Sequence, residues 1–195
     1  MDSGDRATRE VKPYQDIAKS LLDRGLDAPD LTSAKNREDV LTICGSTYLS
    51  GGLSSLKSLQ DSSVDLIFSH AVLEHVRRHE FAETMCECHR ILKPDGIATH
   101  RVDLRDHLGG GLNNLRFSRK RWESDFFVRS GFYTNRIRFS EMIKLMQEAS
   151  FHVEVLNLRR WEKSPIRRKS LSDDFKYVTD EDLLVKGFDV LMRPV

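Results

Sequence analysis

The sequence predicts an α/β fold, and three adjoining features carry that prediction. Residues 64–69 read Val-Asp-Leu-Ile-Phe-Ser, a near-continuous apolar run that is typical of a strand buried in a parallel sheet. Residues 77–92 place apolar side chains at helical spacing, and Lys-Pro-Asp-Gly at 93–96 has the chemistry of a turn. A second strand at 97–104 completes a strand–helix–strand unit, whose crossover is expected to be right-handed.

The part of the chain before residue 61 is predicted to be mostly helical. Apolar residues at helical spacing predict a helix over 11–24, which Gly25 ends. A polar loop follows, and a short helix is expected at about 37–44. Residues 47–49, Thr-Tyr-Leu, are expected to form a strand.

The part after residue 104 is predicted to alternate between loop and regular structure. Residues 105–138 are loop-rich, with a run of glycines and several aromatic side chains. A helix is expected at about 140–149, with Ser140 as its N-cap. Alternation of apolar and polar residues predicts a strand over 151–158, and a last strand is expected at 188–192.

The composition is that of an ordinary globular domain. The chain has 195 residues, of which 39% are hydrophobic and 31% are charged, and a domain of this length can bury a core without disulfides or metals. Three cysteines without a framework spacing argue against an oxidising compartment. No apolar run approaches the ~20 residues of a membrane span, and the first residues lack the apolar core of a secretory signal. We therefore expect a cytoplasmic protein.

Charge is unevenly distributed along the chain, although the net charge is +1. Residues 101–169 hold 16 Lys and Arg residues against 8 Asp and Glu residues. One interpretation is a solvated basic surface. The other is a field that attracts anions such as phosphorylated small molecules, acidic sugars or nucleic acid. Because no established RNA-binding motif accompanies this stretch, a nucleic-acid partner is not expected.

A recognisable motif spans residues 61–96. A strand ending in Ser69 is followed by Leu73-Glu74-His75, a helix, and then Arg-Ile-Leu-Lys-Pro-Asp-Gly at 90–96. This order resembles the class I S-adenosylmethionine-dependent methyltransferases, in particular the branch called methyltransferase type 11. The resemblance covers roughly residues 46–192 and implies a Rossmann-like sheet with S-adenosylmethionine as cofactor.

The resemblance also indicates what precedes the motif in the family. Those enzymes begin with a strand and a Gly-rich loop that holds the cofactor, as other nucleotide-binding loops do. No Gly-x-Gly-x-Gly occurs ahead of residue 61, and the glycine runs at 51–52 and 109–111 lie elsewhere. We therefore expect an N-terminally incomplete sheet, without its first strand and loop, in a truncated domain whose methyl transfer is impaired. A second copy or a partner chain could pair with the exposed strand edges.

In domain terms, the resemblance implies one methyltransferase-like domain over 1–195. Residues 1–60 would be a partial N-terminal part and residues 61–195 the C-terminal part. Asp2 or Asp5 is expected to represent the family's acidic residue, which binds the cofactor's ribose hydroxyls.

The site is expected at the carboxyl ends of the two central strands, where α/β folds bind ligands. The resemblance assigns cofactor contact to Ser69, His70 and Ala71. The expected catalytic residues lie beside them and at the end of the second strand: His75, His100, Asp103 and His107. An imidazole beside a carboxylate can take a proton near neutral pH, although methyl transfer depends chiefly on alignment and needs no dedicated base. The alternative is a polar loop with satisfied hydrogen bonds.

Aromatic residues between 117 and 133 are interleaved with basic ones. Among them, Trp122 and Tyr133 are expected to contact the substrate. They could equally stack on nucleic-acid bases, and plain core packing is the default interpretation.

A metal site is not expected. His75 and His79 have helical ligand spacing but lack the Glu of a zinc-protease motif. Cys86 and Cys88 point to different faces of their helix, and Cys88 is expected in the core.

The resemblance implies methyl transfer to a small acceptor, and the basic stretch is compatible with an anionic one. The alternative is a non-catalytic, methyltransferase-like module that binds a partner or an anion.

Overall fold

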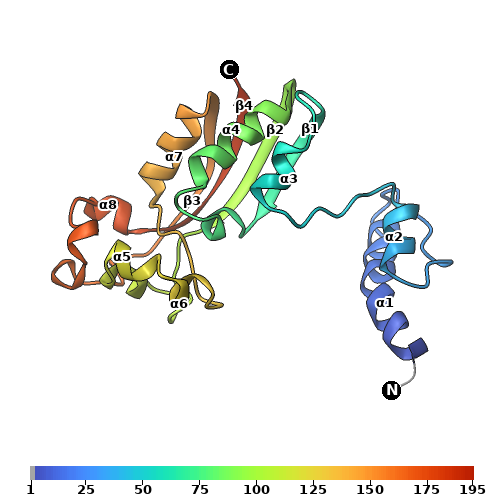
Figure 1. The fold of residues 1–195 in the computed structure, drawn as a ribbon, viewed down its shortest axis with the longest axis horizontal. Coiled ribbons are helices and arrows are strands. Elements are labelled where there is room, and N and C mark those ends of the chain that lie inside the picture. Colours follow the sequence, from blue (N-terminus) through green and yellow to red (C-terminus); the bar gives the residue numbers. More distant parts are fainter. Residues whose placement is uncertain (1–2) are drawn as a thin grey trace. The chain divides into compact units, whose positions relative to one another are not determined.

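A computed structural model describes the backbone of residues 3–195 and the side chains of residues 11–195. Asp2, an expected ribose ligand, lies outside the described residues, and so does the side chain of Asp5, the other candidate. The chain divides into two compact units, Met1–Gly51 and Gly52–Val195 (Figure 1). The single domain expected over 1–195 stays a prediction.

The first unit contains two helices, α1 (Ser3–Leu22) and α2 (Arg37–Ile43). They enclose a small apolar cluster made of Val11, Ala18, Leu31, Ala34 and Val40. The Asn36 side chain caps α2 by accepting a hydrogen bond from the Asp39 N–H at 2.8 Å. The strand expected at 47–49 is wrong: these residues are irregular, and exposed Tyr48 and Leu49 have no strand to pair with.

The second unit is built on a four-stranded sheet in the order β1-β2-β4-β3. Its strands are β1 (Val64–His70), β2 (Leu92–Asp103), β3 (Phe151–Arg160) and β4 (Val185–Pro194). β1 and β2 are parallel, and β4 lies between β2 and β3, antiparallel to both. The α/β class and the strand–helix–strand unit are confirmed.

One face of this sheet is covered by helices α3 (Leu53–Lys57), α4 (Phe81–Ile91) and α7 (Phe139–Glu148) (Figure 1). The main core lies between them and includes Phe81, Met85, Val102, Met142 and Phe188. α4 begins four residues later than predicted, because a 3-10 turn at Leu73–His75 is followed by extended backbone at Val76. Cys88 lies in this core as expected, and burial raises the pKa of its thiol to about 11.

The other side of β1 is open. Alternate residues of this strand are exposed, with Leu66 at 57% and Phe68 at 75% exposure. β1 is also an edge strand, because β2 is its single hydrogen-bonded neighbour in the part of the chain that the structure describes. An apolar edge strand of this kind is unusual in a free monomer, since proteins normally cover or charge such edges.

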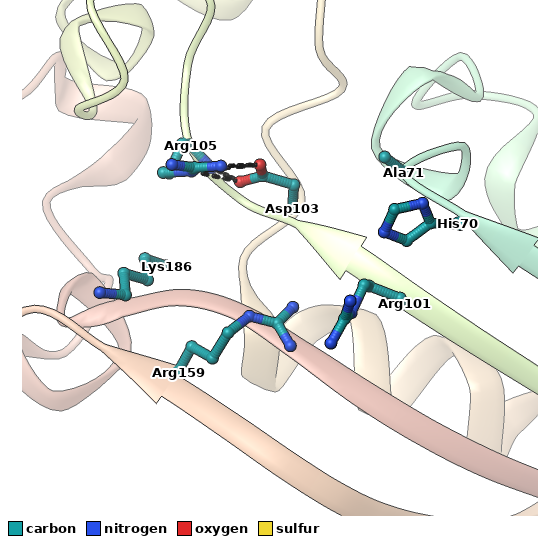
Figure 2. A pocket seen from close by; sticks show the side chains of 7 residues that line it. All are labelled: His70, Ala71, Arg101, Asp103, Arg105, Arg159 and Lys186. Atoms are coloured by element: carbon teal, nitrogen blue, oxygen red, sulfur yellow. Dashed lines mark hydrogen bonds and ion pairs between the residues drawn. The ribbon is translucent and has the colours of Figure 1, made fainter.

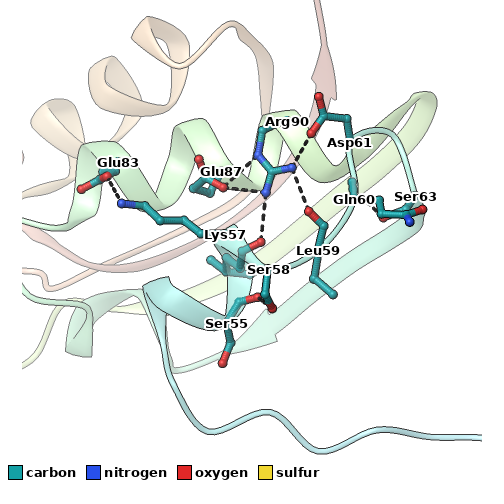
Figure 3. A network of polar contacts seen from close by, with 11 residues as sticks. Ser55, Lys57, Ser58, Leu59, Gln60, Asp61, Ser63, Glu83, Glu87 and Arg90 are labelled. Atoms are coloured by element: carbon teal, nitrogen blue, oxygen red, sulfur yellow. Dashed lines mark hydrogen bonds and ion pairs between the residues drawn. The ribbon is translucent and has the colours of Figure 1, made fainter.

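The approach to β1 is held by Arg90, at the end of α4 (Figure 3). Its guanidinium donates to the carbonyl oxygens of Leu56 (3.0 Å) and Leu59 (2.9 Å). The same group forms ion pairs with Glu87 (2.7 Å) and Asp61 (2.5 Å). One side chain therefore fixes both α3 and the turn that leads into β1.

Several element boundaries differ from prediction. β2 starts at Leu92, so residues 93–96, which were predicted to form a turn, belong to the strand. Its pairing with β1 shifts register across these residues, between the Val64–Leu92 and Leu66–Ile97 pairs. The N-cap of α7 is Arg138, not Ser140. The Ser140 N–H instead donates to the Asp182 carboxylate at 3.3 Å, a long-range contact that local sequence does not reveal.

The remaining segments contain short helical pieces. Between β2 and α7 lie a 3-10 turn at Asn113–Arg116, α5 (Arg119–Trp122) and α6 (Asp125–Val128). Between β3 and β4 lie turns at Arg168–Ser170 and Asp173–Phe175, followed by α8 (Asp180–Leu183). The buried Asp106 carboxylate orders the first segment by accepting backbone N–H groups of Leu108, Gly111, Asn113 and Asn114.

Candidate functional site

The carboxyl end of β1 has an unusual backbone. Ala71 adopts φ of 54°, a left-handed conformation that L-residues seldom take outside turns and functional sites. Its N–H donates to the Arg101 carbonyl at 2.9 Å, so the strand end is tied to β2. His70 and Ala71 both line a cavity here, whereas the Ser69 hydroxyl is hydrogen-bonded to His100 Nδ1 at 2.8 Å.

His100 lies on the helix-covered face of the sheet and not in this cavity. His100 lies on the same face of β2 as Ala98 and Val102, which belong to the main core, and it is itself buried. Burial lowers the pKa of its imidazole to about 4, so the ring is neutral at physiological pH. Its geometry fits a buried hydrogen-bonding partner of Ser69 better than an acid or base.

The cavity has a volume of about 370 Å³ and sits at the carboxyl ends of β1 and β2 (Figure 2). Every strand of the sheet contributes to it. Its lining residues are His70, Ala71, Arg101, Asp103, Arg105, Arg159 and Lys186. This volume is within the range of small-molecule sites.

Two carboxylates hold most of the basic side chains in place. Asp189 accepts from Arg101 Nε at 3.0 Å and from Arg159 Nη1 at 2.7 Å. Burial works to raise the pKa of Asp189, but hydrogen bonds from Arg101, Arg159 and Asn157 outweigh it and lower the pKa to about 2. Asp189 is therefore ionised, and it aligns two guanidinium groups side by side.

The second carboxylate is Asp103, which forms a two-pronged ion pair with Arg105. Burial of Asp103 favours a higher pKa, but the hydrogen bonds and charge of Arg105 prevail and lower it. Lys186 has no side-chain hydrogen bond or ion pair within the described residues. Four cationic side chains therefore face two carboxylates, and the cavity retains an excess of positive charge.

Gly187 makes the position of Arg159 possible. A Cβ at residue 187 would lie 2.8 Å from Arg159 Nη2 and 2.7 Å from the Val102 carbonyl oxygen. The Arg159 guanidinium crosses β4 over this glycine and donates to the carbonyls of Val102 (3.2 Å) and Phe188 (3.4 Å). A larger residue at 187 would clash both with the guanidinium and with the backbone of β2.

The other predicted histidines form a separate pair. His75 Nδ1 donates to the Tyr133 carbonyl at 2.9 Å, and its ring meets the His107 ring edge-on with centroids 5.1 Å apart. Both rings are exposed and neither lines the cavity. The structure thus brings together His75, His107 and the Tyr133 backbone, while Asp103 belongs to the cavity.

Between these two groups lies Glu74, which sequence analysis placed in the motif but gave no role. It is 2% exposed, and its Oε1 accepts from the Asp103 N–H at 3.4 Å. Burial raises the pKa of Glu74 to about 7, backbone hydrogen bonds oppose this rise, and the charge of Asp103 adds to it. The only indication of Glu74 in the sequence was its place in the Leu73-Glu74-His75 motif.

Trp122 and Tyr133 are core residues in this structure and do not line the cavity. Trp122 is 0% exposed, donates from Nε1 to the Thr134 carbonyl at 2.8 Å, and packs against Phe127. The Tyr133 hydroxyl donates to Glu123 at 2.9 Å, and burial together with that carboxylate raises its pKa to about 12. The default interpretation of the aromatic segment, core packing, describes both side chains.

Arg101, Arg105 and Lys186 belong to no motif that marks them as site residues in the sequence. Arg159 belongs to a basic stretch that the charge count detected, but nothing local distinguishes it from its neighbours. Lys186 lies in a segment with no motif, and only the antiparallel placement of β4 beside β2 brings it to the cavity.

The parallel strand pair, the polar cavity at its carboxyl ends and the left-handed Ala71 lie where open α/β sheets commonly bind ligands. A model of the methyltransferase domain family matches residues 14–99, somewhat less than half of the chain. Over these residues the chain is similar to the methyltransferase domain family, which agrees with the resemblance of residues 61–96 to the class I S-adenosylmethionine-dependent methyltransferases. No curated protein sequence matches the chain.

Solved methyltransferases resemble the chain at low identity. One from Archaeoglobus fulgidus is 12% identical, with a TM-score of 0.44 over 92% of this chain and 81% of its own. A Haloferax volcanii methyltransferase, solved with the Trm112 activator, is 15% identical, with a TM-score of 0.49 over 93% and 78%. A possible histamine N-methyltransferase from Thermotoga maritima is 21% identical, with a TM-score of 0.40 over 80% and 68%.

The fit of the cofactor to the described residues is partial. His70 and Ala71 are exposed at the end of β1 and line the cavity. Neither glycine run joins a strand to a long helix: Gly52 precedes the five-residue α3, and residues 109–111 follow the Asp106 turn. Within the described residues, no group of three or more His, Cys, Asp or Glu side chains is placed to hold a metal ion, and no helix is long and apolar enough to cross a membrane.

Proposed function

We propose that this domain transfers a methyl group from S-adenosylmethionine to a small anionic acceptor bound in the cavity at the ends of β1 and β2. The observation that carries the proposal is the cavity itself, which lies beside His70 and Ala71. Its cationic side chains come from β2, β3, β4 and the loop that follows β2: Arg101, Arg159, Lys186 and Arg105. When bound, the cofactor supplies an electrophilic methyl group. The described residues then have to position the acceptor and exclude water.

The lining residues support the following roles. In this proposal His70 and Ala71 lie beside the transferred methyl group, while Arg101, Arg159 and Lys186 attract the acceptor's negative charge. Asp103 is already committed to Arg105 and has a lowered pKa, so it suits orientation of a donor group on the acceptor better than proton abstraction. His75 and His107 are adjacent to each other but do not line the cavity, so the proposal gives them no part in proton transfer.

We expect the cofactor to bind weakly to the 195-residue chain. Contact at 69–71 involves one end of the molecule, and a Gly-rich strand–helix turn ordinarily supplies much of the affinity for such ligands. Full activity would then need a further binding segment, supplied by another part of the polypeptide or by a partner.

A second candidate function is supported by the edge of β1. Its backbone groups face outward, and Leu66 and Phe68 are exposed on the open face. A strand from a second copy or from another protein could pair with this edge and complete the sheet. In that case the domain would act as an interaction module or as one subunit of an enzyme.

A methyl-transfer assay tests the first proposal. The protein is incubated with radiolabelled S-adenosylmethionine and a panel of small phosphates, carboxylates and neutral alcohols or amines. Label is expected in an anionic acceptor and is expected to fall at least tenfold in Arg159→Met. Transfer to neutral acceptors alone would contradict the assignment of the cavity.

A further inference from the structure

The basic cavity has features that distinguish between kinds of anion. We propose that it binds the phosphate group of a phosphomonoester as a dianion. This inference deepens the proposed function by naming the acceptor class, but the binding step does not require methyl transfer to occur.

The net charge of the cavity matches that of a dianion. Arg101, Arg105, Arg159 and Lys186 carry four positive charges, while Asp103 and Asp189 carry two negative charges. Both carboxylates are tied to arginines, which hold their pKa values below the ordinary range. The surplus of two charges matches a phosphate dianion, whereas a single carboxylate would neutralise half of it.

Several N–H donors of the cavity are not used by protein groups. Arg101 binds Asp189 through Nε and Nη2, and Arg105 binds Asp103 through Nε and Nη2. Among the described residues, Nη1 of both arginines and Nζ of Lys186 donate to no protein group. Figure 2 shows these donors at separate places around the cavity, with Arg159 between Arg101 and Lys186. Charge-assisted hydrogen bonds from such groups to an anion are the strong ones.

The Arg159 guanidinium is held in place by protein groups at the cavity. Arg159 is fixed by Asp189 and by two backbone carbonyls, and Gly187 leaves the space that its guanidinium occupies. A guanidinium with both its carboxylate and its backbone contacts in place is preorganised, so little rotamer freedom is lost when an anion binds. The cavity, at about 370 Å³, also leaves room for an organic group that extends toward His70 and Ala71.

Binding of methyl phosphate and of acetate, followed by amide-resolved NMR in the absence of S-adenosylmethionine, tests the proposal. Methyl phosphate is expected to shift resonances of residues 101–105, 159 and 186, with acetate at least tenfold weaker. Because a phosphomonoester gains its second charge near about pH 6, its affinity is expected to rise between about pH 5 and about pH 7.5 relative to that of acetate.

Two variants and a matched control complete the test. Lys186→Met and Arg159→Met are each expected to weaken methyl phosphate binding by about tenfold, because each removes a cation that lines the cavity. Lys144→Met, which removes an exposed lysine of α7, is expected to leave binding unchanged. Comparable affinity for acetate, or an unchanged affinity in folded Lys186→Met, would overturn the proposal. Phosphate binding without any methyl transfer would contradict the proposed function alone.

Discussion

Glu74 offers a quantitative test of how the site is built, through the substitution Glu74→Gln. Burial raises the pKa of this carboxyl from its ordinary value of 4.5 to about 7, so the folded protein prefers the protonated form. The stability associated with that proton is fully present below about pH 4.5 and is lost as the pH rises through about 7. The shift corresponds to about 3 kcal/mol of unfolding free energy.

Glutamine has nearly the shape of the protonated carboxyl and does not titrate. The difference in unfolding free energy between Glu74→Gln and the wild type is therefore expected to move by about 3 kcal/mol in favour of the variant between about pH 4.5 and about pH 8. Comparing the two proteins at each pH cancels all other titrating groups. This matters because His100, whose pKa is lowered to about 4, changes stability in the opposite direction over an overlapping range.

Urea denaturation followed by tryptophan fluorescence measures the difference, since Trp122 is buried in the same unit. His107, whose charge lowers the pKa of Glu74, provides a control: His107→Gln is expected to raise that pKa slightly further. A difference between Glu74→Gln and wild type that stays constant with pH would refute the account of a buried, protonated carboxyl beneath the cavity.

Three further predictions concern other parts of the second unit. In the wild type, the neutral His100 contributes about 3 kcal/mol of unfolding free energy that is present above about pH 6.5 and is lost as the pH falls through about 4. His100→Asn is expected to remove this pH dependence, which denaturation curves of both proteins at low pH would measure. Asn135→Ala should lower the unfolding free energy by about 2–4 kcal/mol, because the buried side chain donates to the carbonyls of Leu73 and Val76 and accepts from the Ile137 N–H; an unchanged urea midpoint would contradict this. Phe68→Glu is expected to keep the fold and abolish any concentration-dependent self-association through β1, as sedimentation velocity would detect, and an oligomer that persists in the variant would exclude this edge as its interface.

Local sequence patterns predicted the elements whose structure is decided locally. The β1–α4–β2 unit was predictable because a buried parallel strand, an amphipathic helix and a Pro-Gly turn each have a clear pattern. The strand proposed at 47–49 failed because a strand exists only with a pairing neighbour, and three residues carry no information about one. The N-cap of α7 failed for a related reason, since Ser140 is engaged by Asp182 from a distant part of the chain.

The sequence indicated the strand ends but not all the residues that line the cavity there. His70, Ala71 and Asp103 were named from the strand ends and line the cavity, and their roles stay predictions. His100 was misplaced because a strand's alternation decides which face a residue takes, and the helices that cover one face are set by tertiary packing. Arg159 and Lys186 reach the cavity through antiparallel pairing of β3 and β4, which no local pattern encodes.

The most direct test of the central claim is a titration of S-adenosylmethionine and S-adenosylhomocysteine into the folded 195-residue chain, followed by amide-resolved NMR. The account predicts shifts centred on Ser69, His70 and Ala71 that saturate at high micromolar to millimolar ligand, and that remain in Lys144→Met. No shift at these residues at millimolar ligand, or shifts confined to another part of the chain, would contradict the placement of the methyl-transfer site at the end of β1.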